Sequence, residues 1–335
     1  MNKKRWGAIA IAAGLFIVSI VMKFAVSALT TDTEASLDQL FASKDEFSEN
    51  VIQEGNKSKK IAVLYVNGVI QDNGQESSLL NSSGYNHQNF MKQLKHVQED
   101  DAVKGIIIRV NSPGGGVVES AEIHDKLLEI EKETKKPVYV SMGSMAASGG
   151  YYISTAANKI FASRDTLTGS LGVIMEGYNY GELAKKLGID FVTIKSGPYK
   201  DIMSPTRPMT QKEKDILQTM INHSYDGFVS VISKGRNIPE SKVRELADGR
   251  VYDGIQAKEL HLIDEFGYFD DVVKAMKKDE NIKNAEVISY GSDFSFPSIF
   301  GMSAQKFISS QFEMDGAMKL LEQPNTPRLM YLYAK

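Results

Sequence analysis

The stretch "GIIIRVNSPGGGV" (Gly105–Val117) decides the fold that we expect for this chain. A short, continuous apolar run such as "GIIIRV" is typical of a strand that is buried on both faces of a sheet. Gly114–Gly116 follow closely and predict a tight turn, and a helix is expected to begin at Val117. Strand, turn and helix in this order form the repeating unit of an α/β domain with a parallel sheet.

The same alternation continues along the chain. Further strands are predicted at "IAVLYVNGVI" (Ile61–Ile70), "PVYV" (Pro137–Val140), "DFVTI" (Asp190–Ile194) and "AEVISY" (Ala285–Tyr290). Helices are predicted at Asn89–Gln98, Val117–Glu133, Ser148–Ala157, Tyr180–Leu187, Glu240–Ala247, Gly254–Leu260 and Phe269–Lys278. Strands and helices at this spacing indicate βαβ units with right-handed crossovers.

One long amphipathic helix is expected after residue 209. Thr210 and Glu213 form the Thr-x-x-Glu pattern of a capping box. Apolar side chains then recur at helical spacing as far as Ile232, and Gly235 is expected to end the helix.

The first residues predict a membrane anchor. Basic residues 3–5 precede the uncharged apolar run Trp6–Met22, which is close to the roughly 20 residues that a membrane-spanning helix needs. This charge pattern places the N-terminus in the cytoplasm and the main domain outside the cell membrane. The alternative is a cleaved signal peptide, because "VSA" (Val26–Ala28) resembles a cleavage site. We assign residues 1–29 to the anchor and the polar residues 30–59 to a stalk.

Composition and charge exclude several classes of function. The 335 residues include no cysteine, which excludes thiolate catalysis, disulfides and cysteine-bound metals. The five histidines show no metal-ligand spacing, so no metal site is predicted. The net charge of −3 gives no indication of nucleic-acid binding. Export of the domain argues against cofactors that are confined to the cytosol.

The glycine turn is the first candidate for chemistry. Gly114, Gly115 and Gly116 leave backbone N–H groups uncovered, as the binding of an anion or an oxyanion requires. A phosphate loop is the obvious rival, but no Gly-Lys-Ser/Thr follows and the dinucleotide-binding fingerprint is absent. On this motif alone, a tight strand-to-helix turn without a ligand remains an equal interpretation.

A second cluster of small residues, "SMGSMAASGGYYIS" (Ser141–Ser154), comes about one βα unit later. Its Ser148 is expected at a helix N-terminus, where the local potential favours a developing negative charge. Gly149 could present its N–H group to the same oxyanion as the glycine turn, because both turns open at the same edge of a parallel sheet. The plainer interpretation is a helix-capping serine among small residues that pack closely.

A nucleophilic serine also needs a base. His124 follows the glycine turn, but we expect it to be a surface or packing residue, and no acid is suggested that would orient the other histidines. The other known solution is a neutral lysine in a water-poor site. Lys195 and Lys200, which follow the run "DFVTI", are the candidates.

Five motifs together resemble a known family. "NSPGGG", "MAASGGYYI", "TGSLGVI", "SGPYKD" and "DGRVYDGIQAKELHLID" occur in the order and spacing of the signal peptide peptidase A family of membrane-anchored serine peptidases. The length is similar to the short form of that family, which has a single catalytic domain. The resemblance covers residues 60–290, which we assign to the peptidase domain. It implies the α/β fold shared by Clp-type proteases and crotonases, built from repeated ββα units.

The resemblance also implies a catalytic pair. Ser148 matches the nucleophile of the family and Lys200 its general base, so Lys200 is preferred to Lys195. Ser170, in "TGSLG", matches the hydroxyl that helps to orient the lysine. The resemblance to the short form further implies a dome-shaped ring of typically eight subunits, in which neighbouring subunits contribute the serine and the lysine of each site.

Other expectations follow from the same resemblance. Gly115 and Gly149 match the oxyanion-hole positions, with Gly114 and Gly116 in support. The implied substrates are apolar peptides, chiefly signal peptides that remain in the membrane after preprotein processing. The reaction that the resemblance implies needs no metal and no cofactor.

The segment 291–335 is expected to be loop-like, and it ends in the apolar tail "PRLMYLYAK". Two interpretations of this tail remain open, because it resembles a peptide that such a protease cuts and it could also be a simple packing segment. Two other functions remain as rivals. A crotonase-like acyl-CoA enzyme would share the fold, although export and the Ser–Lys pair argue against it. A non-catalytic membrane scaffold would not need Ser148 and Lys200.

Overall fold

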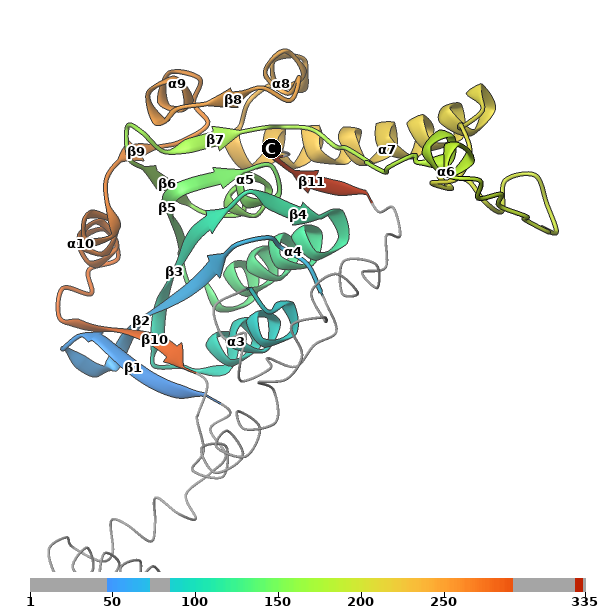
Figure 1. The fold of residues 1–335 in the computed structure, drawn as a ribbon. Coiled ribbons are helices and arrows are strands. Elements are labelled where there is room, and N and C mark those ends of the chain that lie inside the picture. The colour runs from blue at the N-terminus through green and yellow to red at the C-terminus, as the bar shows by residue number, and fades with distance from the viewer. Residues whose placement is uncertain (1–46, 73–84, 292–328, 334–335) are drawn as a thin grey trace, which may run out of the picture. The chain divides into compact units, whose positions relative to one another are not determined.

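The computed structural model describes residues 47–72, 85–291 and 329–333, and Figure 1 shows their arrangement around one mixed sheet. Nine of the described strands form this sheet. Seven lie side by side in the order β1 (Ser48–Gln53), β10 (Ala285–Gly291), β2 (Asn56–Asn67), β3 (Val103–Ser112), β5 (Val138–Ala147), β6 (Lys159–Ala162) and β9 (Glu265–Phe266). The other two strands extend it, since β7 (Leu167–Gly169) pairs with the end of β5 and β8 (Val251–Tyr252) pairs with β7.

The middle of the sheet is parallel and covered on both faces. β2, β3 and β5 are parallel neighbours, and β10 and β6 flank them in the same direction. Side chains of β3 alternate between two hydrophobic clusters, with Ile106 and Ile108 on one face and Ile107 on the other. This burial on both faces explains why the strand is a continuous apolar run, and it confirms the predicted α/β class.

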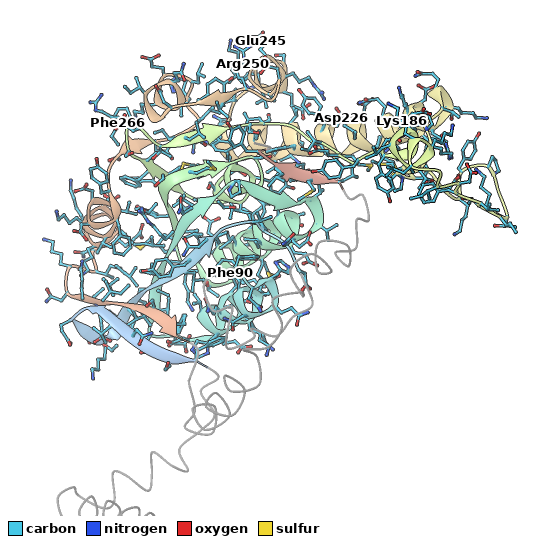
Figure 2. All side chains as sticks on the ribbon, in the orientation of Figure 1. Phe90, Lys186, Asp226, Glu245, Arg250 and Phe266 are labelled. Carbon is cyan, nitrogen blue, oxygen red and sulfur yellow. The ribbon has the colours of Figure 1, made fainter. Side chains whose placement is uncertain are left out.

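Helices form the layers on the two faces, as Figure 1 shows. One face is covered by α3 (His87–Glu99), α4 (Val117–Thr134), α5 (Gly149–Ser154) and the C-terminal half of α7 (Gln211–Arg236). The opposite face is covered by α10 (Phe269–Asp279). Phe90 of α3, labelled in Figure 2, belongs to the first layer. The short helices α8 (Glu240–Leu246) and α9 (Gly254–Glu259) lie at the end of the sheet that carries β7 and β8.

The capping box predicted for the long helix is confirmed. The Thr210 hydroxyl accepts a hydrogen bond from the backbone N–H of Glu213, and the Glu213 carboxylate accepts one from the backbone N–H of Thr210. The helix passes Gly235 and ends at Arg236, with Asn237 in the left-handed conformation as its C-cap. The end expected at Gly235 was therefore slightly early, because Asn also tolerates this conformation.

The strand predicted at 190–194 is wrong. These residues lie in a segment, 176–209, that carries the short helix α6 (Gly181–Lys186) and no strand. We call this segment the arm; Figure 1 shows it beside the N-terminal half of α7, beyond the sheet. The side chains of Val192 and Ile194 are 87% and 97% exposed. The apolar run has no strand to pair with, and most of its apolar surface is uncovered in the described chain, apart from the Phe191 ring, which contacts Tyr180.

Two boundaries also differ from those expected. Residues 48–53 and 56–59 were assigned to the stalk, yet they form β1 and the start of β2. Most of these side chains are exposed, so they lack an apolar pattern. In the segment expected to be loop-like, Met330–Leu332 forms β11.

The predicted anchor, most of the stalk and residues 292–328 lie outside the described residues. Within 47–72, 85–291 and 329–333, no helix combines the length and apolar character that crossing a bilayer requires.

Candidate active site

The glycine turn folds into the short strand β4 (Gly114–Gly116) between β3 and α4. Two of its N–H groups maintain the turn, since Gly114 N donates to Ser112 Oγ at 3.0 Å and Gly116 N donates to the carbonyl oxygen of Ile70 at 2.7 Å. Gly115 lies between them and pairs with Tyr331 of β11. The turn therefore pairs through its backbone with the strand β11.

Ser148 occupies a strained turn between β5 and α5. Its φ of 52° and ψ of −114° place a non-glycine residue in a sparsely populated region, and such strain is concentrated at functional sites. The Ser148 N–H donates to the carbonyl oxygen of Gly169 at 2.8 Å, which holds the turn in place. The Ser148 hydroxyl is buried and has no hydrogen-bond partner among the described residues. A serine on a strained strand-to-helix turn is the arrangement that presents a nucleophile in many hydrolases.

The C-terminal tail lies across this site. β11 pairs antiparallel with β4 on one side. On its other side, Met330 and Ile174 exchange two backbone hydrogen bonds, each of 3.0 Å. The tail is therefore an extended peptide that is held between two segments of the domain.

The carbonyl group of Tyr331 is placed beside both predicted oxyanion-hole residues. A methyl group on Gly114 would overlap the Tyr331 carbonyl oxygen and would lie 2.6 Å from the Gly149 N atom. A methyl group on Gly149 would lie 3.1 Å from both the Gly115 N atom and the same carbonyl oxygen. The close approach of the strand to the turn thus requires glycine at 114, and it leaves little room for a methyl group at 149.

The side chain of Tyr331 fills an aromatic pocket. Its ring stacks on Tyr152 at a centroid distance of 4.9 Å and contacts Phe228 at 4.5 Å. At the end of the pocket, the Tyr331 hydroxyl donates to the backbone carbonyl oxygen of Ser224 at 3.0 Å. The sequence did not indicate this pocket, because its walls come from α5 and α7; the aromatic pair that follows "ASGG" was the one available signal.

Lys200 and Lys195 lie on the arm. Lys200 is exposed, and it makes no hydrogen bond to the hydroxyl of Ser148 within the described chain. Lys195 instead pairs with the carboxylate of Asp201 at 2.6 Å. Arg207 bonds to both Asp201 and the buried Glu213, so a chain of charges fixes the loop around Lys200 to the start of α7.

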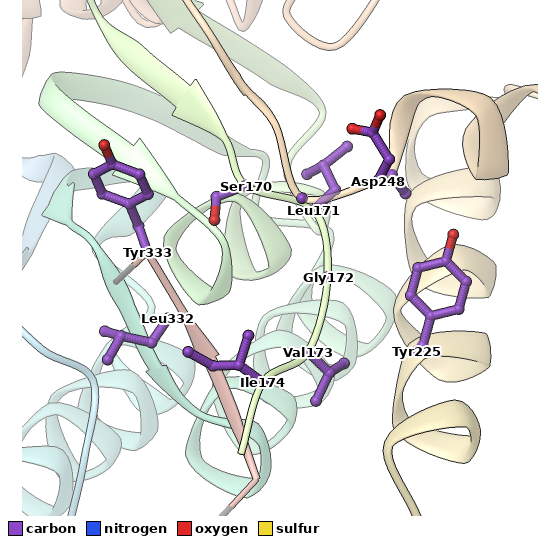
Figure 3. Close-up of a pocket in the computed structure, with 11 residues that line it drawn as sticks. Ser170, Leu171, Gly172, Val173, Ile174, Tyr225, Asp248, Leu332 and Tyr333 are labelled. Carbon is purple, nitrogen blue, oxygen red and sulfur yellow. The ribbon is translucent and has the colours of Figure 1, made fainter. Parts of the chain in front are cut away.

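Ser170 follows β7 near the serine turn, and its φ is also positive, at 50°. It lines a cavity of about 420 Å³ together with Ile174, Asp248 and the tail residues Leu332 and Tyr333 (Figure 3). The Arg250 guanidinium holds the pKa of the Asp248 carboxyl at about 2. The cavity is thus bordered by a hydroxyl, a carboxylate and the end of the bound tail.

His124 is a packing residue, as expected. It is buried with its ring edge-to-face on Tyr152, at a centroid distance of 5.2 Å. Burial lowers the pKa of His124.

Comparisons with known proteins agree with this fold. The chain matches the model of peptidase family S49 over residues 130–283 and the model of Clp protease over residues 80–171. It is 46% identical over 297 residues to the "Putative signal peptide peptidase SppA" of Enterococcus faecium, which covers 88% of this chain and 86% of that protein. It is 37% identical to "Protease 4" of Haemophilus influenzae, over 72% of this chain and 37% of that protein. It is 34% identical to the "Serine protease SPPA, chloroplastic" of Arabidopsis thaliana, over 58% of this chain and 29% of that protein.

The fold and the site thus define a protease of the α/β class with a Clp-protease-like sheet. The chain belongs to peptidase family S49, the serine peptidases that include signal peptide peptidases.

Proposed function

We propose that the chain is a membrane-anchored serine endopeptidase that uses Ser148 as nucleophile and Lys200 as general base. Its substrates are apolar peptides, chiefly signal peptides that remain in the membrane after preprotein processing. The observation that carries this proposal is the position of the tail: an extended apolar peptide places the Tyr331 carbonyl group beside Gly115, Gly149 and the strained Ser148 turn.

The reaction follows from these positions. Neutral Lys200 takes the proton from Ser148 Oγ, which attacks the carbonyl carbon of the peptide. The N–H groups of Gly115 and Gly149 donate to the oxyanion. The C–N bond then breaks, and protonated Lys200 gives its proton to the leaving amine. Water attacks the acyl ester with Lys200 again as base, and this step restores the Ser148 hydroxyl and releases the acid.

Lys200 reaches Ser148 from a neighbouring subunit in this proposal. Support comes from the exposed position of Lys200 and from the uncovered apolar side chains of the arm, such as Val192 and Ile194, because exposed apolar surface of this kind marks an interface. Ser170 borders the cavity beside the tail, and its hydroxyl would orient a lysine that entered this cavity. Head-to-tail contacts of this type form a ring where the rotation between subunits closes, and we propose a closed ring of eight subunits.

The anchor and the tail fit the proposed substrate class. The apolar run at Trp6–Met22 would hold the domain at the outer surface of the membrane, where remnant signal peptides lie. The tail supplies Leu, Met and Tyr to the groove, and these are residue types of apolar segments.

A fluorophosphonate probe tests the nucleophile and the base. Wild type should be labelled at Ser148, and Ser148→Ala should not be labelled. Lys200→Ala should lose at least about 100-fold in labelling rate, because one positioned base contributes that much. Lys186→Ala, an exposed lysine of the same arm, is the matched control and should keep the wild-type rate. Absence of labelling in wild type would remove the peptidase proposal and would favour a scaffold or an acyl-CoA enzyme.

Mixing of inactive variants tests the shared site. Ser148→Ala and Lys200→Ala subunits mixed in equal amounts should recover about one quarter of wild-type activity, since each variant supplies the group that the other lacks in a ring. Dilution of wild type to monomers should abolish activity, and sedimentation should be used to confirm that the diluted protein is monomeric. Full specific activity in true monomers would exclude a shared site.

A further inference from the structure

Ser120, in the first turn of α4, carries a buried hydroxyl that no described group satisfies. The residue is 0% exposed, and its Oγ atom has no hydrogen-bond partner among the described residues. Serine and threonine within helices commonly bond to the carbonyl four residues before, as Ser154 does here to Gly150 at 2.7 Å. Ser120 does not use this bond. An unsatisfied buried hydroxyl is costly, so its presence calls for an explanation.

Its position supplies that explanation. A methyl group on Gly149 would lie 2.7 Å from Ser120 Oγ, and 3.1 Å from both Gly115 N and the Tyr331 carbonyl oxygen. A hydroxyl, a backbone amide and the carbonyl oxygen of the bound peptide therefore surround one point beside the nucleophile. The other buried serine hydroxyl without a partner in the described chain is that of Ser148 itself.

We propose that the Ser120 hydroxyl is a third donor to the oxyanion, in addition to the two backbone N–H groups. This inference rests on the proposed function of the site. The carbonyl oxygen moves out of the peptide plane and gains charge as its carbon becomes tetrahedral. A donor that is unpaired before the reaction and bonded during it binds the transition state more tightly than the substrate, and it thereby raises kcat.

A purely structural role makes the opposite prediction. Ser120 could simply be small enough for α4 to approach α5 at Gly149. In that case Ser120→Ala keeps the size, removes an unsatisfied hydroxyl, and should leave both kcat and KM unchanged.

The experiment compares Ser120→Ala with wild type on a peptide that copies the tail. We expect kcat to fall about 10- to 100-fold, somewhat less than the loss of a principal oxyanion donor, with KM within twofold and Tm unchanged or raised. Ser154→Ala, a second buried serine, is the control and should lower Tm without this loss of kcat.

A second measurement separates transition-state from substrate binding. The inhibition constant of a peptide boronic acid, which forms a tetrahedral adduct with Ser148, should rise in Ser120→Ala by the same factor as kcat falls. Values of kcat and of this constant both within twofold of wild type would overturn the assignment. Failure of the proposed function would look different, because wild type itself would then neither cut the peptide nor bind the boronic acid.

Discussion

Tyr331 lies opposite Gly115 in a two-stranded antiparallel sheet, so residues 330–332 cross the chain's own candidate active site. Because the Tyr331 carbonyl oxygen borders Gly114 and Gly149, we predict that the bond between Tyr331 and Leu332 is the one that Ser148 cuts. We expect the purified protein to lose Leu332–Lys335, and intact-mass spectrometry against Ser148→Ala measures this loss. Identical C-termini in the two proteins would count against self-processing and would favour a packing tail.

The aromatic pocket predicts a preference at the residue before the cut bond. Tyrosine there should be favoured over alanine by about 10- to 100-fold in kcat/KM, because the ring buries its area against Tyr152 and Phe228. A peptide with phenylalanine at this position should have a kcat/KM a few-fold lower than the tyrosine peptide, since the Ser224 carbonyl oxygen then lacks its donor. Rates on synthetic tail peptides check this order, and equal rates for tyrosine and alanine would refute the pocket assignment.

Gly114→Ala should block the groove. Its φ of 99° makes alanine strained, and the added methyl group would overlap the carbonyl oxygen of Tyr331. Gly68→Ala is the matched control, since its φ is 85° and nothing lies within 4 Å of the added methyl group. Both changes should cost about 1–2 kcal/mol of stability, measured by denaturant unfolding. Activity on the tail peptide should fall more than about 100-fold for Gly114→Ala alone, and comparable activity in the two variants would contradict the close strand approach.

We expect the contact between the arm and the start of α7 to weaken at low pH. The Arg207 guanidinium lowers the pKa of Glu213 to about 2, and it lowers that of Asp201 well below its usual range. A carboxyl whose pKa is lower in the folded state stabilises that state at every pH above its pKa in the unfolded state, which is about 4.3 for Glu. This contribution to stability is lost as the pH falls toward the folded-state pKa, about 2 for Glu213. The protection of the arm amides against hydrogen exchange, taken relative to their intrinsic exchange rate at each pH, should therefore fall between about pH 4 and pH 2.

Glu213→Gln is the control for this pH dependence. Its arm should exchange faster than wild type at pH 6, and the two proteins should converge at low pH. An equal difference between them at every pH would show that the charge of Glu213 does not hold the arm.

The sequence predicted the centre of the fold better than its periphery. The runs "GIIIRV" and "DFVTI" look alike, but the first pairs with β2 and β5 while the second lies exposed on the arm. An apolar run indicates that its side chains favour burial, but it does not indicate which surface buries them or whether that surface belongs to the same domain. Ser148 and the glycine turn could be located from the strands that precede them. The Tyr331 pocket and the unpaired Ser120 hydroxyl arise from contacts between distant segments, which no local pattern records.

The groove between β4 and Ile174 has a consequence for what the enzyme can attack. It accepts a chain only as a single extended strand that is bonded along both edges, as β11 is. A folded protein would first have to release such a stretch from its own helices or sheets, at the cost of much of its stability. Peptides without a fold of their own bear no such cost. In the proposed reaction, the shape of the groove therefore favours unfolded peptides over folded proteins, before any side chain is recognised.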